Sequence, residues 1–187
     1  MSARQAKAAA CQTVAMTDAL LASQEAANRL AASRADFVAI QPRVVAGDPW
    51  PLAEDVGIGP EAAWGPREVL AHVAEALPYW LGEYERIIEA GRGANDGVPF
   101  GRVAADPVRI AILERDRTVP LSELFARIDI WIERWQRRLE ATSAGDGEAV
   151  GLHPDRGEMT ADAVRDRMIV RHLEEHLDQL ERILAGD

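Results

Sequence analysis

The sequence predicts an all-α protein, a four-helix bundle with long connecting loops. Apolar residues recur at intervals of three and four residues over four long stretches, which is the period of an amphipathic helix. The composition also favours helices, because Ala, Leu, Glu and Arg are abundant. No stretch shows a convincing alternation of polar and apolar residues, as half-buried strands do. A length of 187 residues suits a single domain with one core.

The first long helix is expected from Asp18 to about Val45, with a thin apolar face. Residues 1–17 are Ala-rich and lack a strong period, so we assign them to an N-terminal extension, frayed or helical. Thr17 is an alternative cap for the helix start. Residues 18–187 then form the bundle domain. A Gly-Asp-Pro-Trp-Pro segment ends the first helix, because proline cannot continue it.

The second long helix follows a loop that contains two glycines and a proline. It is expected to begin at Pro66, because the first helical position needs no backbone N–H. Its broad apolar arc continues to Ile88, and Gly91 is well placed as the C-terminal cap. Pro78 falls inside this helix and should kink it. His72 lies at the margin of the apolar arc, which places it beside the core.

A glycine-rich connection separates the second helix from two further helices. The dipeptide Asp106–Pro107 opens a short helix that is expected to end near Arg115. Pro120 starts the third long helix, which carries aromatic and aliphatic residues at helical spacing as far as Leu139. These aromatic residues are interpreted as core and interface rather than as a cofactor stack.

The last long helix is expected from a cap at Thr160 to about Leu184. A polar, glycine-rich loop at residues 143–157 precedes it. The loops of the chain are longer than a minimal up-and-down bundle requires. Loops of that length at one rim of a bundle usually shape a site.

The composition excludes several classes of protein. The formal net charge is −10, whereas a nucleic-acid-binding surface needs clustered Lys and Arg. A single cysteine, Cys11, cannot form an internal disulfide, which favours a reducing cytoplasm. The sequence lacks an apolar run long enough to span a bilayer and has no signal-peptide pattern, so neither a membrane nor secretion is expected.

Histidines indicate the chemistry of the chain. His172 and His176 are four residues apart, so in a helix both imidazoles point in one direction and can share a metal ion. A surface pair or a hydrogen-bonded core histidine is the alternative. His72 occupies a similar place on the second helix. Three imidazoles leave one position of a tetrahedral ion open for water or substrate, as in a catalytic zinc site, although nickel, iron or manganese would suit the same ligands.

Three segments resemble the DinB/YfiT-like superfamily: residues 64–74, 153–160 and 172–180. The resemblance implies a four-helix bundle, often a homodimer, in which His72, His172 and His176 hold a divalent metal. The group includes thiol-dependent S-transferases that use bacillithiol or mycothiol, and mycothiol-dependent maleylpyruvate isomerases. The superfamily name does not imply DNA binding, which agrees with the acidic composition.

Other candidate site residues surround these ligands. His153, on the segment that the resemblance places near the metal, is a candidate catalytic residue or a structural loop histidine. Glu75 is a candidate general base. Arg102 and Arg171 are candidates to bind an anionic substrate or thiol cofactor. In each metal-bound imidazole, the ring nitrogen that does not bind the metal needs a hydrogen-bond partner. The candidate partners are Glu75, Glu175 and Gln179.

Three functions fit these observations. The first is a metal-dependent transferase that activates a low-molecular-weight thiol, with a small molecule as substrate. The second is a hydrolase that uses metal-bound water, with Glu75 or His153 as general base. The third is a non-enzymatic bundle that binds a metal or small ligand, with a role in stress response or protein contact.

Overall fold

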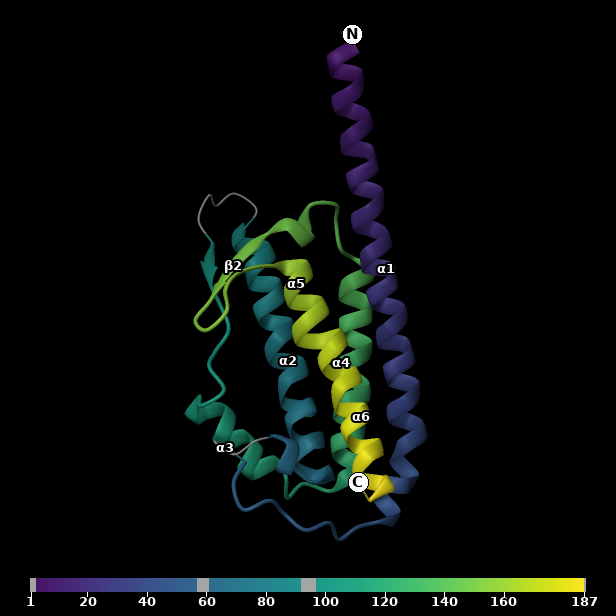
Figure 1. The fold of residues 1–187 in the computed structure, drawn as a ribbon, viewed down its shortest axis with the longest axis vertical. Helices are drawn as coiled ribbons and strands as arrows, with labels where there is room; N and C mark the ends of the chain where they lie inside the picture. Colours follow the sequence, from purple (N-terminus) through teal and green to yellow (C-terminus); the bar gives the residue numbers. More distant parts are fainter. Residues whose placement is uncertain (1–2, 57–60, 92–96, 187) are drawn as a thin grey trace.

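The computed structural model describes residues 3–56, 61–91 and 97–186. Within these ranges, four long helical segments run side by side along the long axis of the molecule (Figure 1). They are α1 (Ala3–Ala46), α2 (Pro66–Gly91), α4 (Leu121–Glu140) and a last segment made of α5 (Ala161–Arg165), a π-helix (Asp166–Val170) and α6 (Arg171–Ala185). The predicted four-helix bundle is therefore confirmed.

The helix boundaries follow local signals in the sequence. Pro66 begins α2, as predicted, and Pro78 lies inside the helix. Gly91, predicted as the C-terminal cap, is the last helical residue before the undescribed residues 92–96, so the cap stays a prediction. The Thr160 hydroxyl accepts a hydrogen bond from the Ala163 backbone N–H at 3.1 Å and caps the last segment. Asp106 caps α3 (Pro107–Asp116) in the same way, and this short helix lies beside α2, outside the bundle (Figure 1).

Helix α1 begins earlier than its apolar period suggested. It starts at Ala3 and is continuous through Thr17, so no cap forms at that residue. Its N-terminal turns extend beyond the other helices of the bundle (Figure 1). Helix-favouring alanines account for a helix over residues that lack an apolar face.

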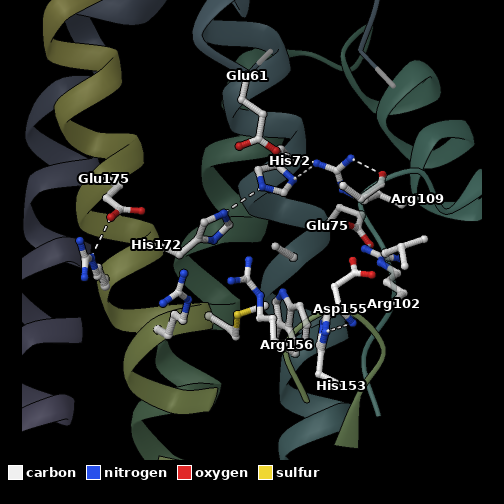
Figure 2. A pocket seen from close by; sticks show the side chains of 17 residues that line it. Glu61, His72, Glu75, Arg102, Arg109, His153, Asp155, Arg156, His172 and Glu175 are labelled. Atoms are coloured by element: carbon white, nitrogen blue, oxygen red, sulfur yellow. Dashed lines mark hydrogen bonds and ion pairs between the residues drawn. The ribbon is translucent and has the colours of Figure 1, made fainter. Parts of the chain in front are cut away.

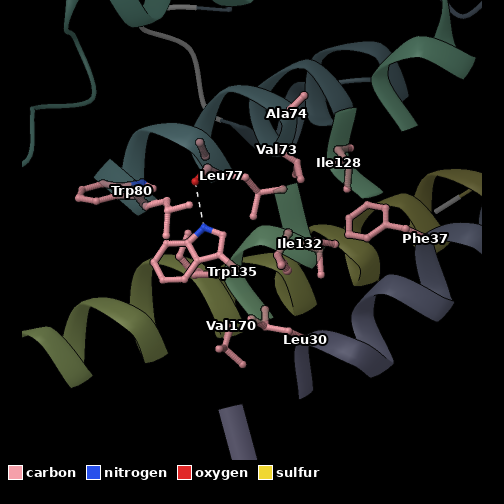
Figure 3. Packing of buried hydrophobic residues seen from close by; sticks show 14 of the residues in the cluster. Leu30, Phe37, Val73, Ala74, Leu77, Trp80, Ile128, Ile132, Trp135 and Val170 are labelled. Atoms are coloured by element: carbon pink, nitrogen blue, oxygen red, sulfur yellow. Dashed lines mark hydrogen bonds between the residues drawn. The ribbon is translucent and has the colours of Figure 1, made fainter. Parts of the chain in front are cut away.

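The core lies where α2 and α4 meet, with α1 and the last helix closing it. Trp135 of α4 is fully buried, and its indole N–H donates to the Leu77 carbonyl of α2 at 2.9 Å (Figure 3). Leu30 and Phe37 of α1 pack on the same cluster, as does Val170 of the π-helix. This packing fixes the position of α2 against α4.

A small sheet contradicts the expectation of a chain without strands. In the described residues it has three strands in the order β1 (Val98–Pro99), β2 (Val150–His153) and β3 (Gly157–Thr160). Strand β1 is parallel to β2, and β2 is antiparallel to β3, with His153 opposite Gly157. Strands of two to four residues are too short to show a period of two. The hairpin sits over one end of α2.

No helix in the described ranges combines the length and the hydrophobicity that crossing a bilayer requires.

Candidate metal centre

Three imidazoles converge between α2 and α6. The Nε2 atom of His172 lies 2.9 Å from the Nε2 atom of His72 and 2.9 Å from that of His176. The ligating nitrogens of all three residues lie within 4.8 Å of one another. His72 and His176 are buried and His172 is partly buried. The structure thus brings together the three histidines that the sequence predicted as ligands. Figure 2 shows two of them, His72 and His172.

Hydrogen bonds among the three imidazoles cannot satisfy all three Nε2 atoms. A ring nitrogen of neutral imidazole carries either a hydrogen or a lone pair in the ring plane. The Nε2 atom of His172 can therefore make one such hydrogen bond, yet it faces two Nε2 atoms at the same distance. A cation that accepts a lone pair from each of the three Nε2 atoms would satisfy all of them at once. The donor set fits a divalent metal that keeps an open position.

The environment keeps these histidines neutral. Burial, together with the neighbouring imidazoles, lowers the pKa of His172 to about 3 and holds the pKa of His72 well below its ordinary value. Burial also lowers the pKa of His176. Neutral imidazole is the form that binds metal, so the ligands are ready near neutral pH.

Gln179 orients one ligand. Its amide NH₂ donates to the Glu61 carbonyl at 2.7 Å, so its oxygen faces the Nδ1 atom of His176 at 2.9 Å. Nδ1 must then carry the hydrogen, which leaves the lone pair on Nε2.

The contact at the Nδ1 atom of His72 is longer. An Arg109 nitrogen lies 3.5 Å from its Nδ1 atom, beyond ordinary hydrogen-bond length, and the same nitrogen donates to Glu61 at 3.0 Å.

A π-helix sets the direction of the last ligands. Residues Asp166–Val170 form one wide turn directly before α6. One inserted residue rotates everything that follows by about 100° relative to the preceding helix. His172 and His176 therefore face α2, although Val164 and Leu173 remain in the core. Turns of π-helix within α-helices often mark functional sites. The amino-acid composition of this segment did not predict the turn.

His72 and His172 line a pocket of about 440 Å³. Its walls come from α2, from the segment before α3, from the β2–β3 turn and from the start of α6 (Figure 2). The charged lining consists of four acids and five arginines: Glu61, Glu75, Asp155, Glu175, Arg102, Arg109, Arg156, Arg167 and Arg171. The long loops thus form much of the wall of the pocket.

Glu75, predicted as a general base, is buried in the pocket wall. One of its carboxylate oxygens accepts a hydrogen bond from Arg102, whose guanidinium also stacks on the Tyr79 ring at 3.8 Å. The other oxygen, Oε2, is buried without a partner among the described residues. Glu75 lies one helical turn after His72, so its side chain projects from the same side of α2 into the pocket that His72 lines.

His153 also lies where the prediction required, in the pocket wall. It is buried and stacks on Trp80 with ring centres 6.1 Å apart. Its Nδ1 atom accepts the Asp155 backbone N–H at 3.1 Å, and burial lowers its pKa. The neutral ring therefore carries its hydrogen on Nε2, which has no partner in the described part of the chain. His153 offers a hydrogen-bond donor rather than a base.

Gly101 makes room for this histidine. Its φ angle is +77°, and a Cβ atom there would lie 2.4 Å from the Cδ2 atom of His153. Both the backbone conformation and the contact require glycine at this position.

The two predicted anion-binding arginines already have carboxylate partners. Arg102 pairs with Glu75, and Arg171 pairs with Glu175 at 2.8 Å on the exposed face of α6. Sequence reasoning missed Arg109, Arg156 and Arg167, which line the same pocket. Arg156 lies in the segment 153–160 that the resemblance placed near the metal, but it was not singled out there. Nothing in the spacing of Arg109 and Arg167 marks them among the other arginines, because folding alone brings them into this pocket.

One solved structure has the same fold. The chain superimposes on YfiT from Bacillus subtilis with a TM-score of 0.61 and 17% sequence identity, covering 88% of this chain and 86% of that one. YfiT is described as a probable metal-dependent hydrolase with an unusual four-helix bundle topology. The match confirms the resemblance at the level of the fold. Comparisons with protein-family models and with curated proteins gave no match.

Proposed function

We propose that the protein is a divalent-metal-dependent hydrolase of a small molecule, with His72, His172 and His176 as metal ligands. The observation that carries this proposal is the convergence of three histidine nitrogens within 4.8 Å of one another, beside a pocket that His72 and His172 line. A bound divalent ion would act there as a Lewis acid and lower the pKa of a water molecule at its open position. The structural likeness to YfiT, itself a probable metal-dependent hydrolase, supports this reaction class.

Glu75 supports hydrolysis over thiol transfer. Water is a weak acid, so its activation benefits from both a metal and a base. The unpaired Oε2 atom of Glu75 supplies the base, while Arg102 holds the other oxygen in place. A thiol that coordinates a metal is deprotonated outright and depends less on a protein base. His153 would donate its Nε2 hydrogen to the substrate.

The second candidate is transfer of a low-molecular-weight thiol, such as mycothiol or bacillithiol, to an electrophile. The pocket supports it in two ways. A volume of about 440 Å³ admits a ligand larger than water, and the pocket lining contains no cysteine that would supply a protein thiol. The cytoplasmic location and the homodimer stay predictions from the sequence and from family resemblance.

Thiol dependence separates the two reactions. The protein is loaded with zinc, nickel, iron or manganese in turn and tested with an activated ester and with a chlorinated arene, each with and without added thiol. Hydrolysis predicts ester cleavage that needs metal but no thiol and is lost in His72→Ala. Turnover of the arene only with thiol would instead support transfer. A protein that binds metal and turns over neither class favours the non-enzymatic function.

A further inference from the structure

The charges that line the pocket are not fully paired. Three of its four acids pair with three of its five arginines: Glu75 with Arg102, Glu61 with Arg109 at 3.0 Å, and Glu175 with Arg171 at 2.8 Å. Arg156 and Arg167 remain. Neither has a carboxylate oxygen of a described residue within 4.0 Å, and Asp155 is the one acid left beside them. Two arginines are therefore available to a ligand.

The pocket is also a positive region of an acidic protein. Five arginines against four acids give the lining a formal charge of +1, and a divalent ion at the histidines would raise it to +3. The whole chain carries −10. A cleft whose sign opposes that of its surroundings concentrates ligands of the opposite charge, here anions.

The two arginines come from separate elements that meet at the pocket. Arg156 is in the turn between β2 and β3, and Arg167 is in the π-helix that precedes the ligands. Figure 2 shows Arg156 on the side of the pocket away from Arg109, with His172 and His72 facing the space between. Guanidinium groups bind carboxylate and phosphate with paired hydrogen bonds.

We infer that Arg156 and Arg167 bind the anionic group of the substrate, so that the substrate class is small molecules that carry a carboxylate or phosphate group. The anion occupies the arginine side of the pocket and the reacting group faces the histidines. The placement of the reacting group beside the histidines rests on the proposed function. Anion binding does not rest on it, because anion binding depends only on the two arginines.

Direct binding tests the inference. The probes are succinate for carboxylates, methyl phosphate for phosphates and succinamide as the neutral analogue of succinate. Calorimetry gives the dissociation constant of each probe for metal-loaded and metal-free protein, and elemental analysis gives the metal content. The test variant is Arg156→Gln/Arg167→Gln. The matched control, Arg134→Gln/Arg182→Gln, removes the same charge from exposed arginines that do not line the pocket.

The wild-type protein is expected to bind at least one of the two anions and not succinamide. The test variant should keep its metal and bind that anion about 10-fold or more weakly, in both metal states, whereas the control changes little. The anion that binds more tightly identifies the group. Equal affinity in the test variant and the control would overturn the inference, as would tight binding of succinamide. A protein that holds no metal but shows the arginine effect contradicts the proposed function alone.

Discussion

The Gln179 side chain determines which nitrogen of His176 carries the hydrogen. The amide cannot be turned around, because its NH₂ group is engaged by the Glu61 carbonyl at 2.7 Å. Its oxygen therefore accepts from Nδ1 at 2.9 Å, and Nε2 points to His172 with a free lone pair. The same contact ties α6 to the segment before α2. A residue outside the ligand set thus prepares the metal site.

Replacing Gln179 should weaken metal binding without removing a ligand. In Gln179→Leu the imidazole of His176 loses its fixed tautomer and orientation, so we expect a 10- to 100-fold loss of metal affinity. Competition with a chromophoric chelator measures this loss. The control is Asp178→Asn, at an exposed neighbouring position of α6. Equal affinity in Gln179→Leu and wild type would show that the contact does not act on the metal.

The substitution Glu75→Gln tests whether the Glu75 carboxylate is the general base of ester hydrolysis. The substitution keeps the shape of the side chain and an oxygen for Arg102 but removes the proton acceptor, so kcat for ester hydrolysis should fall by about 100-fold or more. Metal content should not change, because Glu75 is not a ligand. The matched control is Glu175→Gln, an exposed acid of the same pocket, which should retain its rate. Wild-type kcat in Glu75→Gln would exclude the carboxylate as base.

Metal-free protein should lose stability as the pH falls. Burial lowers the pKa of His172 to about 3, whereas an unfolded histidine titrates near its ordinary value of about 6.5. Between these values the unfolded chain binds the proton and the folded chain does not, so acid favours unfolding. Each pH unit in that window costs about 1.4 kcal/mol for such a group.

Urea denaturation of the metal-free protein at several pH values between about 7 and 4 measures this dependence. His172→Gln removes one titrating group and should give a shallower slope than wild type. Parallel slopes for the two proteins would show that His172 titrates normally in the folded state.

Glu68 fixes the loop segments that precede α2, the helix that carries His72. Its fully buried carboxylate accepts backbone N–H groups of Gly65 and Ala53 at 3.1 and 3.0 Å, and Arg117 lies 3.6 Å away. Glu68→Ala would leave these donors unpaired, so we expect a loss of about 3 kcal/mol in the free energy of unfolding. Urea titration measures it. Glu89→Ala, at an exposed position of α2, should change stability by less than about 0.5 kcal/mol.

Local signals explain why the helices were predictable. Pro66, Thr160 and the Asp106–Pro107 pair each act within one helical turn, and the structure uses all of them. The β2–β3 hairpin was missed because its strands span four residues each, which is too short for a pattern of their own, and because β2 packs on α2, which lies far from it in the sequence. Tertiary context decides such segments.

The site was predictable only in part, for a related reason. His172 and His176 share one helix, so their spacing alone gives their relative position. Arg109, Arg156 and Arg167 reach the pocket through three different elements, and no spacing in the chain relates them to His72. Their charge partners are also set by the fold. Arg102 was a candidate for anion binding, yet the structure pairs it with Glu75.

Measuring the metal content shows whether His72, His172 and His176 bind an ion, and His153 provides the control among the four histidines of the chain. Protein prepared without chelator, dialysed against each divalent metal in turn and assayed by elemental analysis, should hold about one ion per chain for at least one metal. His172→Ala should hold none, and His153→Ala, in the same pocket but outside the ligand set, should hold as much as wild type. A wild-type protein that retains no metal, or a His172→Ala variant that retains as much as wild type, would contradict the account.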